Sequence, residues 1–233
     1  IKRITKLRDA RTDRSIAMAK LKPEFRKAVH IERFLREARI LANLEHTNIV
    51  PLYEINHDRD ELPYFTMRLL KGETLASVLS KLRSDTGNYR ELYPLETLLE
   101  IYIKACDAMA YAHSQSIIHL DLKPENIQVN EYGEVMILDW GFAKNINDSE
   151  DPLDEADLST FSPVDPNLTQ LGSINGSPGY MSPEQAMPDR TSYTQASDIY
   201  SLGAVLYAIL TLQRPFEGSP IEDSVEYTRK GIL

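Results

Sequence analysis

The chain has 233 residues and a formal net charge of −9, with 42% hydrophobic and 26% charged residues. This balance is typical of a globular protein, argues against a disordered or fibrous chain, and suits one large or two small domains. The longest nearly apolar run, residues 200–212, is shorter than the roughly 20 residues that a bilayer-spanning helix needs. We therefore expect a buried helix there and no membrane segment in this chain.

Cysteine usage and the N-terminal residues indicate the compartment. The only cysteine, Cys106, excludes an internal disulfide framework and a multi-cysteine metal site. Residues 1–14 are basic and lack an apolar core, so no signal peptide is expected there. We expect a cytoplasmic domain, and a membrane anchor elsewhere in the parent protein is compatible with it.

Charge is unevenly distributed along the chain. Residues 1–40 hold 13 Lys and Arg against 5 Asp and Glu, whereas residues 142–170 hold 7 acidic residues and Lys144 alone. The basic side chains alternate with apolar ones and have few aromatic neighbours, so we expect no nucleic-acid partner. The acidic stretch lacks any period and is typical of a long loop.

Periodicity predicts a strand-rich first third and a helix-rich remainder, which together indicate the α+β class. The joint is expected near residues 68–72. Strands are predicted at residues 1–5, 15–21, 49–55 and 64–70, helices at residues 24–44, 75–83, 95–113 and 196–212, and a hairpin at residues 127–138.

The most informative stretch is residues 119–126, which read H-L-D-L-K-P-E-N and are followed by a hairpin and then by D-W-G at 139–141. This order brings the oxygen atoms of Asp121, Asn126 and Asp139 and the cation of Lys123 to one cleft. Asn126 and Asp139 are suitable Mg²⁺ ligands together with phosphate. Asp121 is then left to accept a hydrogen bond from an attacking hydroxyl.

These residues resemble the protein kinase superfamily, whose patterns H-x-D-x-x-x-x-N and D-x-G they match. Residues 176–184, G-S-P-G-Y-M-S-P-E, resemble the end of an activation segment. Asp198 resembles the helix-borne aspartate that braces the catalytic loop, and Glu37 resembles the glutamate of the N-lobe helix. The motif sequences most closely resemble those of bacterial Hanks-type Ser/Thr kinases. The resemblance extends from about residue 15 to residue 216.

The resemblance implies a two-lobed α+β fold, truncated at both ends. The N-lobe is expected at residues 1–70, partial because the glycine-rich loop is missing. The mostly helical C-lobe is expected at residues 71–233, partial because its last helices are missing.

The resemblance also implies a chemistry: transfer of the γ-phosphate of ATP, with Mg²⁺, to Ser or Thr hydroxyls of protein substrates. Asp121 would accept the hydroxyl proton, Lys123 would neutralise charge on the transferred group, and Asn126 completes the catalytic set. Asn126 and Asp139 would hold the metal. Ser177 matches the hydroxyl residue that contacts the catalytic Asp and Lys.

Nucleotide-binding residues follow from the same alignment. Met67 takes the gatekeeper position, and the backbone of Arg68 and Leu70 would meet adenine. Glu37 and Asp139 complete this group together with a phosphate-binding lysine.

That lysine can be assigned in two registers on the strand at residues 15–21. In one, Ala19 takes the lysine position and Lys20 points to the other face, because strand side chains alternate. In the other, a one-residue slip turns Lys20 toward the cleft. We prefer Lys20, because a β-bulge would restore its aim. With Ala19 in that position, the ion pair between this strand and Glu37 cannot form, and we expect phosphoryl transfer to be severely impaired.

One further departure from the family and two rival functions remain. Leu120 replaces the arginine that binds a phosphorylated activation loop in many kinases, so activity should not depend on phosphorylation at Ser159, Thr160, Thr169 or Ser173. The main rival function is a pseudokinase or regulatory module that binds without transferring phosphate. A small-molecule phosphotransferase is disfavoured, because residues 176–184 resemble a peptide-docking segment.

Overall fold

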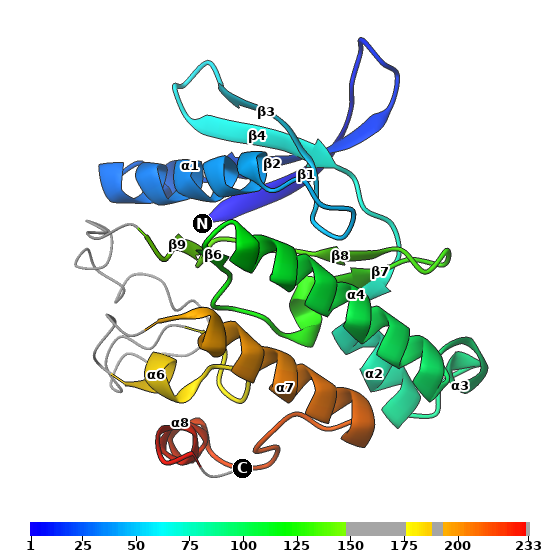
Figure 1. The fold of residues 1–233 in the computed structure, drawn as a ribbon. Helices are drawn as coiled ribbons and strands as arrows, with labels where there is room; N and C mark the ends of the chain where they lie inside the picture. The colour runs from blue at the N-terminus through cyan, green and yellow to red at the C-terminus, as the bar shows by residue number, and fades with distance from the viewer. Residues whose placement is uncertain (148–175, 188–192, 232–233) are drawn as a thin grey trace.

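The computed structural model of the protein describes residues 1–147, 176–187 and 193–231, so the four candidate phosphorylation sites and most of the acidic stretch lie outside the described residues. A β-sheet region is followed by a largely helical region (Figure 1), which confirms the expected α+β class. The first sheet is antiparallel, with the strand order β1-β2-β4-β3. Its strands are β1 (Lys2–Arg8), β2 (Ser15–Leu21), β3 (Leu52–His57) and β4 (Pro63–Arg68).

Helix α1 (Ala28–Asn43) packs against β3 and β4. Its buried positions Phe34, Ala38 and Leu41 recur at the helical spacing and form one apolar face. The Phe34 ring lies 5.1 Å from the ring of Phe65 on β4. The helix begins at Ala28 rather than at residue 24, because a short 3₁₀ turn, η1 (Pro23–Phe25), comes first.

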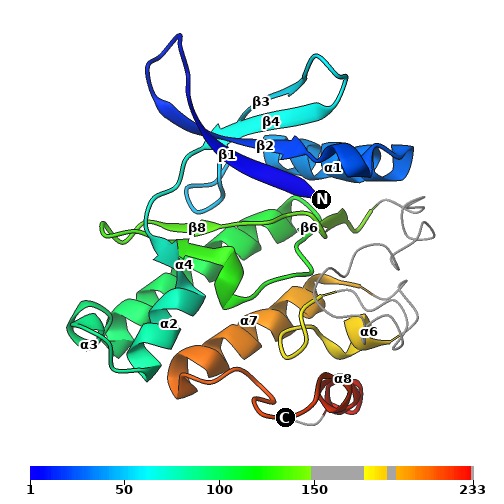
Figure 2. The same ribbon diagram turned by 180° about the vertical axis from the view of Figure 1, so that it is seen from behind.

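The helical region contains one long pair of packed helices, α4 and α7, and small β-elements that carry the loops between them (Figure 2). The strands β5, β7 and β8 form one small sheet, and β6 and β9 form another. The elements are β5 (Glu73–Thr74), α2 (Leu75–Arg83), α3 (Tyr89–Leu92), α4 (Leu95–Ser114), β6 (Ile117–Ile118), η2 (Pro124–Asn126), β7 (Ile127–Val129), β8 (Val135–Ile137), β9 (Lys144–Asn145), α6 (Pro183–Ala186), α7 (Gln195–Thr211) and α8 (Ile221–Arg229).

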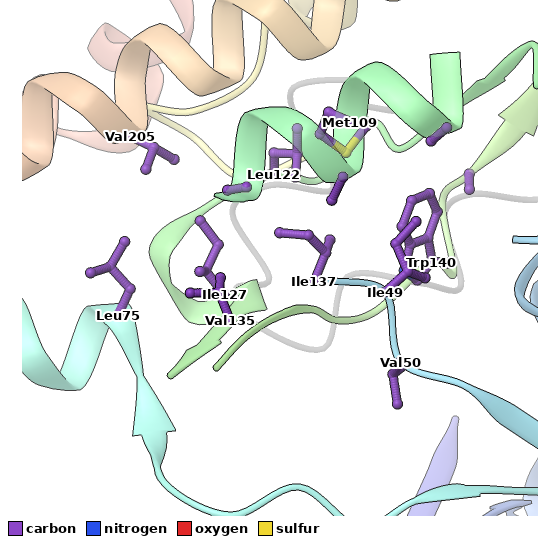
Figure 3. Close-up of a cluster of buried hydrophobic side chains, with 14 of the residues drawn as sticks. Ile49, Val50, Leu75, Met109, Leu122, Ile127, Val135, Ile137, Trp140 and Val205 are labelled. Atoms are coloured by element: carbon purple, nitrogen blue, oxygen red, sulfur yellow. The ribbon is translucent and has the colours of Figure 1, made fainter. Parts of the chain in front are cut away.

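One hydrophobic core runs through both regions. Ile49, which precedes β3, lies beside Ile137 of β8 and near Trp140 (Figure 3). The Ile137 N–H donates to the Asn48 carbonyl at 2.8 Å, so a backbone bond holds the two regions together at this point. Ile49, Ile137 and Trp140 are all almost completely buried, and the core therefore fixes how the sheet region sits on the helical region.

Helix α7 differs from the expectation of a wholly buried helix. Leu202, Val205 and Ile209 are buried, but 61% of Ile199 and 57% of Leu210 are exposed. The apolar run therefore has one face in the core and one face at the surface. Composition alone does not reveal this division, because both faces carry apolar residues.

The segment that joins the two regions passes through Gly72, just before β5. Gly72 has a φ of +93°, and a Cβ there would lie 2.0 Å from the Val129 carbonyl oxygen on β7. The chain thus needs glycine for two independent reasons, the left-handed backbone and the close approach of another strand.

We predict that Gly72→Ala destabilises the protein more than Gly218→Ala. Gly218 has a similar φ of +87°, but a Cβ there meets nothing within 4 Å. Backbone strain alone should cost about 1–2 kcal/mol in Gly218→Ala, and the clash in Gly72→Ala should add about 1–3 kcal/mol. Urea unfolding of both variants measures the difference, and equal losses would contradict the close approach to Val129.

Candidate active site

The predicted catalytic loop lies between β6 and β7 and is held by one buried carboxylate. Asp198 on α7 accepts the backbone N–H of His119 at 2.8 Å with Oδ2 and that of Leu120 at 2.9 Å with Oδ1. Its Oδ2 also lies 2.8 Å from Nε2 of His113. Leu120 has a φ of +63°, a left-handed conformation that is strained for a branched residue. The two hydrogen bonds to Asp198 hold the loop in this shape.

The His119 side chain connects the loop to the residue before Asp139. Its Nε2 lies 3.0 Å from the Leu138 carbonyl, and its Nδ1 accepts the Asp121 N–H at 3.2 Å. Because a carbonyl only accepts, Nε2 carries the hydrogen and the ring is the neutral tautomer. The imidazole thereby orients Asp121 and the Asp139 segment together.

Asp121, Lys123 and Ser177 form a closed triangle of polar contacts. Lys123 Nζ donates to Asp121 Oδ2 at 2.8 Å and to Ser177 Oγ at 2.6 Å. The Ser177 hydroxyl donates to Asp121 Oδ1 at 2.9 Å. Asp121 is 6% exposed, so its charge is compensated by these contacts rather than by bulk water.

The segment that carries Ser177 is fastened to the loop by Gln185. The Gln185 amide donates to the Leu120 carbonyl at 2.7 Å, and its oxygen accepts the Ser182 N–H at 2.9 Å. A Cβ at Gly176 would lie 2.9 Å from the Gln185 amide nitrogen. This close packing keeps Ser177 within reach of Asp121.

Asn126 contacts Asp121, and the turn that carries Asp139 is joined to the same loop. The Asn126 side-chain nitrogen donates to the Asp121 carbonyl at 2.8 Å and to Asp121 Oδ2 at 3.1 Å. The Leu138 N–H donates to the Asn126 carbonyl at 2.8 Å, which ties the start of the Asp139 turn to the loop. Trp140 follows Asp139 and is completely buried, with its ring 4.7 Å from that of His119.

The donor atoms at Asn126 and Asp139 suit Mg²⁺. In the described part of the chain, no three or more His, Cys, Asp and Glu side chains are grouped to hold a metal by themselves. Mg²⁺ is usually bound by one or two protein oxygens together with phosphate oxygens and waters. Asn126 uses its amide nitrogen toward Asp121, which turns its oxygen away, and the Asp139 side chain is 45% exposed. The pair therefore fits a magnesium ion held jointly with phosphate.

The structure differs from the preference for Lys20 as the partner of Glu37. Strand β2 pairs with β1 and β4 in unbroken register, with no bulge in it. Ala19 lies on the buried face, and Lys20 lies on the other face, where its Nζ forms an ion pair with Asp58. The first register, with Ala19 in the position that the family gives to lysine, is thus the one that the strand adopts.

Glu37 is paired instead with Lys2, a residue that the sequence reasoning did not consider. Lys2 Nζ contacts Glu37 Oε1 and lies 2.9 Å from Asp139 Oδ1. Burial lowers the pKa of Lys2, but the two carboxylates outweigh it and the pKa lies above its ordinary value. Burial raises the pKa of Glu37, which the Lys2 charge partly offsets. Partial burial also acts to raise the pKa of Asp139, but the Lys2 ammonium holds it below its usual range.

The residues expected to contact adenine lie where β4 ends. Met67 is the next-to-last residue of β4 and is partly buried. The Arg68 N–H donates to the Pro51 carbonyl at 3.1 Å, and its guanidinium holds Glu134 with two bonds of 2.5 and 3.0 Å. Leu70 is partly buried against the core. The N–H of Arg68 is therefore already engaged.

Comparison with known proteins identifies the fold. The family model described as protein kinase domain matches residues 3–232. The chain belongs to the protein kinase family. Among its relatives are the serine/threonine-protein kinases PknD of Protochlamydia amoebophila, 38% identical over 91% of this chain, and of Chlamydia caviae, 40% identical over 79%. PknD of Chlamydia trachomatis serovar D is 36% identical over 89%.

The kinase chain spans only about a fifth of the length of these relatives, between 20% and 23% in the three cases. Within the described residues, no helix is both long and apolar enough to cross a bilayer.

We predict that Asp198→Asn lowers both stability and activity. The two backbone N–H groups bind different oxygens of Asp198, so an asparagine in either orientation presents its NH₂ to one of them. The buried donor left without an acceptor should cost about 1–3 kcal/mol, measured as a lower free energy of unfolding. Asp107→Asn on the exposed face of α4 makes the same chemical change and should alter neither property. Equal stability of the two variants would rule out this role for Asp198.

Proposed function

We propose that the chain is the catalytic domain of a protein serine/threonine kinase, which transfers the γ-phosphate of ATP to Ser or Thr hydroxyls of proteins. The observation that carries this proposal is the triangle of Asp121, Lys123 and Ser177 beside Asn126 and Asp139. In this triangle the Asp121 carboxylate can accept a proton, and the Lys123 ammonium lies in contact with it. A substrate hydroxyl that reaches Asp121 therefore also comes within reach of the Lys123 charge. The names of the relatives, which are serine/threonine-protein kinases, support the same function.

In the proposed reaction the substrate hydroxyl oxygen attacks the γ-phosphorus, the bond to the β,γ-bridging oxygen breaks, and ADP leaves. Asp121 orients the hydroxyl and takes its proton. Lys123 neutralises the charge that develops on the transferred phosphoryl group. Phosphoryl transfer depends mostly on positioning and electrostatic stabilisation, which agrees with a site whose polar groups are fixed by hydrogen bonds to Asp198 and His119.

A magnesium ion at Asn126 and Asp139 would neutralise phosphate charge when bound. Asn126 serves two purposes in this proposal, because its nitrogen fixes Asp121 and its oxygen is the proposed metal ligand. Asp139 stays ionised beside Lys2, as a metal ligand must. Met67, Arg68 and Leu70 are proposed to border adenine.

A surface groove next to the triangle favours protein substrates over small molecules. It is lined by Lys123, Pro124 and Glu125 of the loop, by Ser177 and Pro178, and by residues of α2 and the segment after α7. A groove of this kind accepts an extended peptide and leads its hydroxyl to Asp121. We propose ATP and Ser/Thr-containing proteins as the partners, no nucleic acid, and a cytoplasmic location for the domain.

One observation favours the rival pseudokinase function. Ala19 is completely buried and occupies the position where the family has its phosphate-binding lysine. If no other cation reaches the phosphates, the domain binds partners without transferring phosphate. Measurement of transfer separates the two functions.

We predict that the full-length protein phosphorylates a generic basic protein with Mg²⁺ and radiolabelled ATP, and that Asp121→Asn reduces kcat by about 10²–10⁴-fold. The substitution keeps the size of the side chain but removes its ability to take the proton. Asp107→Asn is the matched control and should keep full activity. A folded wild-type protein without transfer would favour the pseudokinase.

We also predict that transfer requires a divalent cation. A chelator should abolish activity and excess Mg²⁺ should restore it. Asn126→Ala removes one proposed ligand, so the Mg²⁺ concentration for half-maximal rate should rise, whereas Asn43→Ala at the exposed end of α1 should leave it unchanged. An unchanged Mg²⁺ requirement in Asn126→Ala would contradict the assignment of this ligand.

A further inference from the structure

We infer that Lys2 on β1 binds the phosphates of ATP and takes the role that the kinase family gives to a lysine on the strand after it. This inference rests on the proposed phosphoryl transfer. It resolves the difficulty that Ala19 raises, because the required cation reaches the site from a neighbouring strand.

The strand register places Lys2 on the correct face of the sheet. In the β1–β2 pairing, Lys2 lies opposite Leu21 and Ile4 lies opposite Ala19. Residues directly opposite each other in an antiparallel pair share a face, and alternate residues of one strand do too. Lys2 therefore shares the face of Ala19, whereas Lys20 lies opposite Arg3 on the other face.

The position along the strand is also correct. Both views show the start of β1 close to α1, on the side of the sheet that faces the helical region (Figures 1 and 2). Lys2 Nζ reaches Glu37 on α1 and Asp139 after β8, so one ammonium group joins the sheet, the helix and the proposed metal ligand. Its side chain is 25% exposed and that of Glu37 is 8% exposed, so part of the lysine remains open to solvent.

The hydrogen-bonding capacity of Lys2 leaves room for a phosphate. An ammonium group has three N–H donors, and the contacts with Glu37 and Asp139 use two of them in the described part of the chain. The third donor is available for a phosphate oxygen. The contact with Glu37 holds the ammonium beside α1. The contact with Asp139 holds it next to a proposed Mg²⁺ ligand, so the ammonium and the metal would bind the same phosphate groups.

The packing around Glu37 and Asp139 matches this arrangement. Gly141 lies against both carboxylates, and a Cβ there would be 3.4 Å from Asp139 Oδ1 and 3.6 Å from Glu37 Oε2. Ala19 is part of the core cluster that includes Phe34 and Ala38 of α1. An apolar side chain, Ala19, thus takes the position that the family gives to lysine. The carboxylates of Glu37 and Asp139 are still present, and Lys2 pairs with both.

The test compares lysine-to-methionine variants of the full-length protein. We expect Lys2→Met to lower kcat by about 10²–10³-fold and to weaken Mg·ATP binding. Lys6→Met is the matched control, because Lys6 lies on the same strand and face but is exposed, and it should leave both quantities unchanged. Lys20→Met tests the alternative lysine, and we expect this variant to transfer phosphate at the wild-type rate.

A double variant, Lys2→Met with Ala19→Lys, tests whether a cation on this face of the sheet is what transfer requires. Returning a lysine to position 19 should restore transfer well above that of Lys2→Met. This comparison also holds if Lys2→Met alone fails to fold. A folded double variant without recovered transfer would overturn the inference, as would a Lys2→Met protein as active as Lys6→Met, or a loss of transfer confined to Lys20→Met.

Calorimetric titration with Mg·ATP separates this inference from the proposed function. If the wild-type protein binds Mg·ATP but transfers nothing, the proposed function fails. The Lys2 inference then stands only if Lys2→Met binds Mg·ATP more weakly than Lys6→Met does. Equal affinities would overturn it, and a wild-type protein that binds no Mg·ATP would overturn both.

Discussion

The geometry of the candidate site depends on the need to satisfy buried backbone N–H groups in a loop that is neither helix nor strand. A buried donor without an acceptor is costly, and the left-handed turn at Leu120 leaves two such donors side by side. Asp198 supplies one oxygen to each. The neutral His119 ring then continues the network to Asp121 on one side and to Leu138 on the other. One carboxylate on α7 therefore fixes the start of the loop that carries Asp121, Lys123 and Asn126.

Electrostatics around Glu37 show how a fold can keep a charge arrangement while the residue that supplies the charge changes. A buried carboxylate requires a nearby cation, but the requirement does not specify which strand provides it. Lys2 satisfies it from β1, and Ala19 is then free to pack as an apolar residue. The pairing of β1 with β2 places the two positions on one face, so the substitution needs no change in the backbone.

Local patterns in the sequence predict most of the fold and much of the site. The strand at Ser15–Leu21 and the helix at Leu75–Arg83 have the predicted bounds, because alternation and helical period are local properties. The spacing of the motif also predicts one loop and one short hairpin. These elements carry the predicted site residues Asp121, Lys123, Asn126 and Asp139. Lys2 could not be found in this way. A one-residue slip in the pairing of β1 with β2 would place Lys2 opposite Lys20 rather than opposite Leu21 and would turn it to the other face.

The burial of Trp140 has a consequence for the movement of Asp139. The indole is completely enclosed beside His119 and adjoins Asp139 in the chain. An aromatic side chain of this size buries about 150–250 Å², so exposing it would cost about 4–6 kcal/mol at ~25 cal/mol per Å². A conformation in which this segment leaves the core would thus be populated in about one molecule in a thousand or fewer. Because Trp140 is the single tryptophan of this chain, its fluorescence emission reports on the enclosed state of the segment that carries Asp139.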